Sequence, residues 1–305
     1  MYQSRPGRNE KVGILRQKDI LLDVSESGVL MQFLLQNLQG KSRDNIKSLL
    51  RFKQVWVDGK PVSQFNYALQ PGQQVVVKGE RRQEGDLNRY FHIVFEDEHL
   101  IVIDKQAGLL SMSAGSEHVT AYSLLSAYLK RQNPDSKIFI VHRLDRDTSG
   151  LMIFAKNEEV QRTLQTGWQS DIRERTYIAL VEGNMEKQEG TIKSYLFESK
   201  AFIMYSSQDP AKGELAITHY KTIKQGKNFA LLEVNLETGK KNQIRVHMQD
   251  IGHSVAGDKK YGSKQNPIGR LGLHASALAF LHPVTGELLR FTSGIPARFQ
   301  RVFQL

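Results

Sequence analysis

Short apolar segments of strand length follow one another through the last two thirds of the chain, and they determine its fold class. Patterns with the spacing of a helix lie between them, mainly at residues 121–131 and 158–168. Because strands outnumber helices and often follow one another directly, we predict an α+β fold with a mixed but mostly antiparallel sheet, rather than a parallel doubly wound one. The predicted strands cover residues 92–95, 100–104, 138–141, 151–155, 177–182, 229–236 and 277–281.

A polar stretch around residues 79–90, with two glycines and few apolar side chains, separates this part from the start of the chain. We interpret residues 81–90 as a linker, which predicts an N-terminal domain over residues 1–80 and a larger domain over residues 91–305. The first domain is predicted to be a small α/β unit of two helices followed by short strands. These helices are expected at residues 29–38 and from residue 41 onward, and the strands at residues 55–57 and 73–78.

Composition narrows the classes of protein that the chain can belong to. It has no cysteine, which excludes disulfides, zinc–thiolate sites, iron–sulfur clusters and thiol nucleophiles. Lys and Arg number 42 against 32 Asp and Glu, a net charge of +10, which favours a polyanionic partner. The start has no secretory h-region, and no apolar run approaches 18 residues. We expect a cytoplasmic monomer without a membrane partner.

The second predicted helix concentrates positive charge in the N-terminal domain. Residues 1–80 hold twelve Lys and Arg against seven Asp and Glu. For such a helix taken alone, a solvated charged surface is the better explanation. Together with the strand and turn V-x-V-D-G-K at residues 55–60, however, the arrangement resembles the ribosomal protein S4-like RNA-binding domain over about residues 25–80. The resemblance implies RNA contacts from Lys41, Arg43, Lys47, Arg51 and Lys53.

Three motifs that would imply a bound nucleotide or metal are incomplete. Residues 40–42 end like a phosphate-binding loop, but Leu35 stands where that loop needs its first glycine. Residues 145–150 begin like a calcium loop, but Lys156 replaces the carboxylate required at the twelfth position. Four histidines lack the spacing of a metal site, and we interpret them as ordinary hydrogen-bonded side chains. They are His247, His253, His274 and His282. We predict no metal and no cofactor.

Polar and small residues fill the connection between two apolar strands at residues 141–151, where functional groups tend to collect. Local physics alone leaves a capped, charged turn equally possible. The nine positions H-R-L-D-x-x-T-S-G, at residues 142–150, resemble the signature of the RluA/RluD-type RNA pseudouridine synthases. Further segments match that family, at residues 93–108, 175–183, 218–220, 236–247 and 273–275. Three positions depart from it: Gln106, Lys240 and Asn242.

The resemblance implies roles for individual residues. Asp145 would be the nucleophile or proton acceptor, and Arg245 would keep its carboxylate charged. Tyr177 would pack against the target base. The remaining residues implied to bind substrate are Arg143, which would fill the space left by the flipped base, Ile244 as an apolar wall, His142 and Thr148.

The function that follows is isomerisation of specific uridines to pseudouridine in structured RNA, with ribosomal RNA of the large subunit as the expected partner. A transfer RNA enzyme of the same family is the alternative substrate class. From other classes, a metal-dependent phosphohydrolase would use Asp145 with Asp147, and a noncatalytic ribosome-binding module would rely on the N-terminal domain alone.

Overall fold

A computed structural model describes residues 19–38, 43–51, 54–78, 87–113, 119–168 and 170–304. The chain divides into two compact units between Gln83 and Glu84. Most of the predicted linker, residues 81–86, lies outside the described residues. Its last part differs from the prediction, because Leu87 and Tyr90 pack against the core of the second unit.

The N-terminal unit packs two helices and a small sheet around one apolar core. Leu30 and Leu34 of the first helix and Ile46 and Leu50 of the second are buried in this core, as their helical spacing predicts. Antiparallel strands form the sheet in the order β1-β6-β3-β4, and β2 pairs with β5. The elements are β1 Ile20–Asp23, β2 Gly28–Val29, α1 Leu30–Asn37, α2 Arg43–Arg51, β3 Val55–Val57, β4 Lys60–Pro61, β5 Ala68–Leu69 and β6 Gln74–Val77.

The predicted basic helix is α2, and its charged side chains are placed in part. Arg43 and Lys47 are exposed, one helical turn apart and away from the buried Ile46. The side chain of Arg51, together with Lys41 and Lys53, falls outside the described residues. The S4-like resemblance of this unit therefore stays a prediction.

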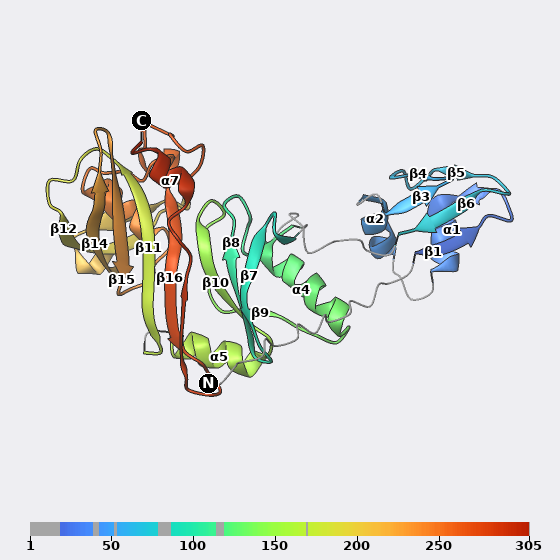
Figure 1. Ribbon diagram of the computed structural model, residues 1–305, viewed down its shortest axis with the longest axis horizontal. Helices are drawn as coiled ribbons and strands as arrows, with labels where there is room; N and C mark the ends of the chain where they lie inside the picture. Colours follow the sequence, from blue (N-terminus) through green and yellow to red (C-terminus); the bar gives the residue numbers. More distant parts are fainter. Residues whose placement is uncertain are drawn as a thin grey trace, which may run out of the picture. The chain divides into compact units, whose positions relative to one another are not determined.

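The second unit is built on one large mixed sheet (Figure 1). Nine strands follow the order β13-β12-β14-β15-β11-β16-β10-β8-β7, while β17 pairs with β16 and β9 with β10. All of these pairs are antiparallel except β10 with β16. The predicted α+β class is confirmed. The strands are β7 Phe91–Glu96, β8 Leu100–Lys105, β9 Phe139–Ile140, β10 Ser149–Ala155, β11 Ile172–Glu182, β12 Glu189–Glu198, β13 Met204–Ser207, β14 Glu214–Gln225, β15 Phe229–Leu236, β16 Leu273–Leu281 and β17 Leu288–Thr292.

Helices cover both faces of this sheet. Alternate strand residues point to opposite sides, and apolar residues occur on both sides. On β8, Ile101 and Ile103 pack in the cluster of α4, whereas Leu100 and Val102 pack in that of α5. In the other half, α6 packs against β11 and β15 through Ile244. Among the described residues, no helix is long and apolar enough to span a membrane. The helices are α4 Ala121–Gln132, α5 Glu158–Thr166, α6 Gln243–Asp250 and α7 Ala297–Arg301, with short 3-10 turns η1 Pro210–Lys212 and η2 Lys259–Tyr261.

The two halves of the sheet meet at the short parallel pairing of β10 with β16. Only Ser149 with His274 and Gly150 with Ala275 are in register there. Gly150 has φ +114°, and a Cβ atom at this position would lie 2.1 Å from the carbonyl oxygen of Ala275. Glycine is therefore required for the close approach. The turn immediately before β10, which contains the sequence motif, lies where the two halves join.

Candidate active site

The turn carrying Asp145 is fixed by backbone hydrogen bonds. The Thr148 N–H donates to the carbonyl of Asp145 at 3.2 Å, which closes the turn. The carbonyl of Arg146 accepts from the N–H of Gly108 at 2.8 Å and from Lys105 Nζ at 3.1 Å. The segment that follows β8 therefore holds the turn, and the Asp145 side chain is presented on a rigid support.

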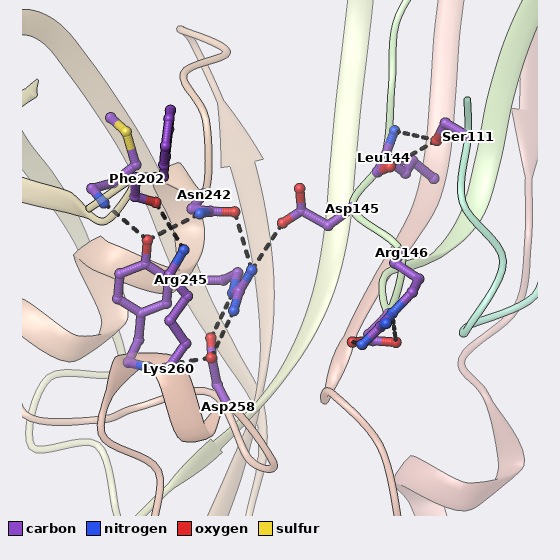
Figure 2. A network of polar contacts seen from close by, with 12 residues as sticks. Ser111, Leu144, Asp145, Arg146, Phe202, Asn242, Arg245, Asp258 and Lys260 are labelled. Atoms are coloured by element: carbon purple, nitrogen blue, oxygen red, sulfur yellow. Dashed lines mark hydrogen bonds and ion pairs between the residues drawn. The ribbon is translucent and has the colours of Figure 1, made fainter. Parts of the chain in front are cut away.

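Two buried polar side chains complete this support. Ser111 Oγ donates to the carbonyl of Leu144 at 2.7 Å and accepts from its N–H at 3.1 Å (Figure 2). Lys105 is fully buried, and burial lowers the pKa of its ammonium to about 8, although the nearby Asp147 and Asp145 carboxylates oppose that fall. Neither Lys105 nor Ser111 was predicted as a site residue, because a lysine that ends a strand gives no local sign of burial.

Arg245 of α6 joins Asp145 to a second carboxylate. Its Nη1 lies 3.1 Å from Asp145 Oδ2, and its Nε and Nη2 lie 2.6 and 2.8 Å from the two oxygens of Asp258 (Figure 2). The side chain of Asp258 is 1% exposed, that of Arg245 14% and that of Asp145 32%. The structure thus brings Asp145 and Arg245 together, but Arg245 forms its bidentate ion pair with Asp258. Asp145 stays accessible from solvent.

Asn242 and Tyr261 orient the guanidinium further. Asn242 Oδ1 accepts from Arg245 Nη1 at 3.0 Å, and its amide donates to the Tyr261 hydroxyl at 2.9 Å. The guanidinium carbon lies 4.8 Å from the centre of the Tyr261 ring, in cation–π geometry. Burial works to lower the pKa of Arg245, but its hydrogen bonds and attraction to Asp258, and the charge of Asp145, raise that pKa above the usual value. The guanidinium is therefore held permanently charged.

Tyr177 and Ile244 lie on the apolar side of the site. Tyr177, on β11, packs against both the cluster that contains Leu144 and the cluster that contains Ile244. Burial raises the pKa of its phenol to about 12; Arg175 opposes this, and the negative charge of Asp145 adds to it. The phenol is therefore protonated at neutral pH, and Tyr177 offers a ring and a hydrogen-bond donor rather than a base.

Three predicted substrate-binding residues differ in their placement. The His142 ring packs on Trp168 at 4.7 Å, and its Nε2 accepts from the N–H of Ile153 at 3.0 Å. Burial lowers the pKa of His142 to about 3, so this ring is neutral. Thr148 is 2% exposed. His142 is half-buried and Thr148 is buried, and their role in binding substrate stays a prediction. Arg143 is exposed and makes no ion pair within the described part of the chain.

The rival pair of carboxylates is not assembled into one site. Asp147 is 46% exposed and binds the guanidinium of the adjacent Arg146 at 3.2 Å, whereas Asp145 points to Arg245. Within the described ranges, no three His, Asp or Glu side chains are grouped so that they could hold a metal ion. The four histidines form ordinary hydrogen bonds: His247 with Ser194 and Thr218, His253 with the Glu182 carbonyl, His274 with Ser149 and Ser293, and His282 with Asp97.

Sequence reasoning missed Asp258 and Tyr261 and noted Asn242 only as a departure. A usable signal was present in the polar segment at residues 257–262, where two glycines flank an aspartate and a tyrosine three residues apart. That spacing places the carboxylate and the ring on one turn of η2. Nothing in the segment, however, indicates that their common partner is an arginine on α6.

Comparison with known proteins agrees with this geometry. The model of the RNA pseudouridylate synthase family matches residues 99–250. A solved structure, human RNA pseudouridylate synthase domain containing 4, has a TM-score of 0.60 and 22% identity, covering 72% of this chain and 94% of that one. Its likeness shows the fold.

Two sequence relatives cover almost the whole chain. An uncharacterized RNA pseudouridine synthase of Bacillus subtilis, YlyB, is 34% identical over 87% of this chain and 89% of its own length. The ribosomal large subunit pseudouridine synthase D of Haemophilus ducreyi is 32% identical over 90% of both. The chain therefore belongs to the RNA pseudouridylate synthase family. It is an RNA pseudouridine synthase of the RluA/RluD type, as the motif at residues 142–150 predicts.

Proposed function

We propose that this enzyme converts specific uridines of large-subunit ribosomal RNA to pseudouridine, with Asp145 carrying the reaction. The observation that supports this most directly is the 3.1 Å contact between the Asp145 carboxylate and Arg245, which Asp258 fixes from behind. One carboxylate at the family motif is thereby paired with a guanidinium while it stays partly open to solvent.

The chemistry requires such a carboxylate. The bond between ribose C1′ and uracil N1 breaks, the base turns, and a bond forms between C1′ and uracil C5; the proton on C5 leaves and N1 gains one. Asp145 acts at the nucleoside as nucleophile or as proton acceptor, and either role needs the ionised form. Arg245 places a permanent positive charge 3.1 Å from that carboxylate.

The surrounding residues suit a flipped base. Extruding a base from folded RNA costs roughly a few kcal/mol. An aromatic platform returns about 1–3 kcal/mol per base. Tyr177 supplies a ring beside Asp145, and Ile244 packs with it as an apolar wall. The exposed guanidinium of Arg143, two residues before Asp145, fills the space that the base leaves in the RNA.

Mutating the proposed reactive group tests this assignment. Asp145→Asn is nearly isosteric, but its amide is a very poor nucleophile or base, so release of tritium from uracil C5 should fall to background while the protein stays folded. Asp147→Asn is the matched control in the same turn and should keep substantial activity. Robust turnover by Asp145→Asn would overturn the assignment. Equal losses at both positions, with dependence on added magnesium, would favour the phosphohydrolase.

The choice of ribosomal RNA rests on different support. The relative from Haemophilus ducreyi is named for the large ribosomal subunit, and the chain carries a net charge of +10 with a basic helix in its N-terminal unit. Mapping pseudouridines across all cellular RNA with and without the gene tests the choice. Sites that disappear only from transfer RNA would replace the ribosomal substrate by the alternative one.

A further inference from the structure

An exposed aromatic ring stands at the tip of the hairpin formed by β12 and β13. Phe202 is 71% exposed and has φ +59°, in the left-handed region that bulky residues rarely adopt. Such an outlier persists only where the surrounding structure enforces it, and it commonly marks a functional position. Neither the sequence motifs nor the Asp145 site accounts for this ring.

Several contacts hold Phe202 in that conformation. Its N–H donates to the carbonyl of Ser199 at 2.9 Å, and its own carbonyl accepts from Lys260 Nζ at 2.9 Å. Two residues further on, the N–H of Met204 donates to the hydroxyl of Tyr261 at 3.2 Å. Tyr261 is the ring that packs on Arg245, so the hairpin tip and the Asp145 site are connected through one network of contacts (Figure 2).

Lysine side chains lie on and near Phe202, together with one carboxylate. Lys241 Nζ lies 5.8 Å from the ring centre and pairs with Glu198. Lys260 holds the Phe202 carbonyl, and Lys200 is exposed two residues before the ring. An aromatic face among lysines is complementary to a nucleotide, whose base stacks while its phosphate meets the ammonium groups.

We propose that Phe202 is a stacking platform for an unpaired base of the RNA substrate, with Lys200, Lys241 and Lys260 facing the flanking phosphates. The proposal rests on the RNA substrate of the proposed function, and it adds a second base-binding position outside the Asp145 pocket. The backbone hydrogen bonds of the tip favour this use, since a loop that is already ordered loses little conformational entropy on binding.

The test compares variants of the full-length enzyme by fluorescence anisotropy. The probes are a labelled single-stranded RNA of mixed sequence, about ten nucleotides long, and a fully paired duplex of the same sequence. Phe202→Gly should weaken binding of the single strand about 5- to 150-fold, the equivalent of about 1–3 kcal/mol of stacking. Binding of the duplex and the salt dependence should stay unchanged. Because glycine adopts positive φ freely, this variant should melt no lower than the wild type.

Further variants separate stacking from other contacts. Phe202→Trp should restore binding of the single strand, and Phe202→Leu should not. Tyr205→Ala is the matched control: Tyr205 is exposed on the same hairpin, but its ring already stacks on Phe197 at 5.9 Å, so its removal should leave binding unaltered.

Three outcomes would overturn the platform: wild-type affinity of Phe202→Gly for the single strand, an equal loss on both probes, or full rescue by Phe202→Leu, which would indicate an apolar protein-docking residue. Tritium release by the wild type on structured RNA is measured separately. Its absence would refute the proposed function, while a selective effect at Phe202 would still support the platform.

Discussion

Asp258→Asn tests whether the buried carboxylate, rather than Asp145, holds Arg245 in place. Asp258 accepts two guanidinium hydrogen bonds of 2.6 and 2.8 Å at a position where its side chain is 1% exposed. An asparagine has one oxygen to accept such a bond, and its amide N–H groups would face a guanidinium that has only donors. We therefore expect Arg245 to lose its orientation while Asp145 is chemically intact.

The magnitude follows from these contacts. Hydrogen bonds to charged groups contribute about 1.5–3 kcal/mol each. Asp258→Asn loses one of these bonds and weakens the other, because the carboxylate charge is gone, so the cost is at most about 3–6 kcal/mol. Removing one partner of a buried ion pair costs about 3–5 kcal/mol by measurement on other proteins. Both routes give a loss near 4 kcal/mol. For a domain the size of residues 84–305, each kcal/mol lowers Tm by about 2–4 °C, so we expect a fall of roughly 8–16 °C.

Calorimetry on the full-length variants, alongside tritium release, measures both consequences. Asp147→Asn removes an exposed pair with Arg146 and should cost under about 1 kcal/mol. Asp145→Asn loses one bond to a partly exposed group, so it should melt well above Asp258→Asn although it alone abolishes turnover completely. If Asp258→Asn melts within about 2 °C of the wild type, the buried pair does not stabilise the site and the reasoning is refuted.

Three other perturbations give distinct readouts. Deleting residues 1–83 should weaken RNA binding and flatten its dependence on salt, because fewer phosphate contacts release fewer counterions; an unchanged slope in filter binding contradicts this. Activity should survive exhaustive chelation by EDTA apart from effects on RNA folding, and a loss that one transition metal alone restores would implicate the histidines. The pKa of Lys105 is about 8 in the folded protein and 10.5 in the free side chain. Between pH 8 and 10.5, the unfolded chain therefore binds a proton at Lys105 that the folded protein has lost. Stability relative to Lys105→Met should therefore rise by up to about 3 kcal/mol from pH 8 to 10.5, and denaturant titrations showing no rise would contradict the burial of a charged lysine.

Much of the fold was predictable because strongly apolar segments determine it. The strand at residues 229–236 is confirmed at both ends, and α4 and α5 lie within two residues of their predicted bounds. By contrast, α6 was not predicted. Its buried face includes Gln243 and His247, whose side chains are satisfied by hydrogen bonds from β12 and β14. Buried polar residues interrupt the apolar periodicity on which sequence reasoning depends.

The candidate site, like the fold, was predicted only in part. The resemblance at residues 142–150 drew attention to Asp145, and a separate motif to Arg245, which the structure places in contact. The motif did not show which way its side chains point: the His142 ring packs on Trp168, and Thr148 is buried. Side-chain direction depends on packing against strands that are distant in sequence, and a local pattern does not contain that information.

Arg245 also acts as a tie between the two halves of the sheet, in parallel with the two residue pairs of the β10–β16 seam. If Asp145 forms a bond to the ribose, its negative charge disappears and the tie loses one end at the moment when the detached base must turn. The two halves would then be held together less tightly only during the reaction. Asp145→Asn reproduces that loss of charge, so hydrogen exchange at Ser149, Gly150 and Ala275 should be faster in this variant than in the wild type. Unaltered exchange there would mean that Arg245 does not help to hold the two halves together.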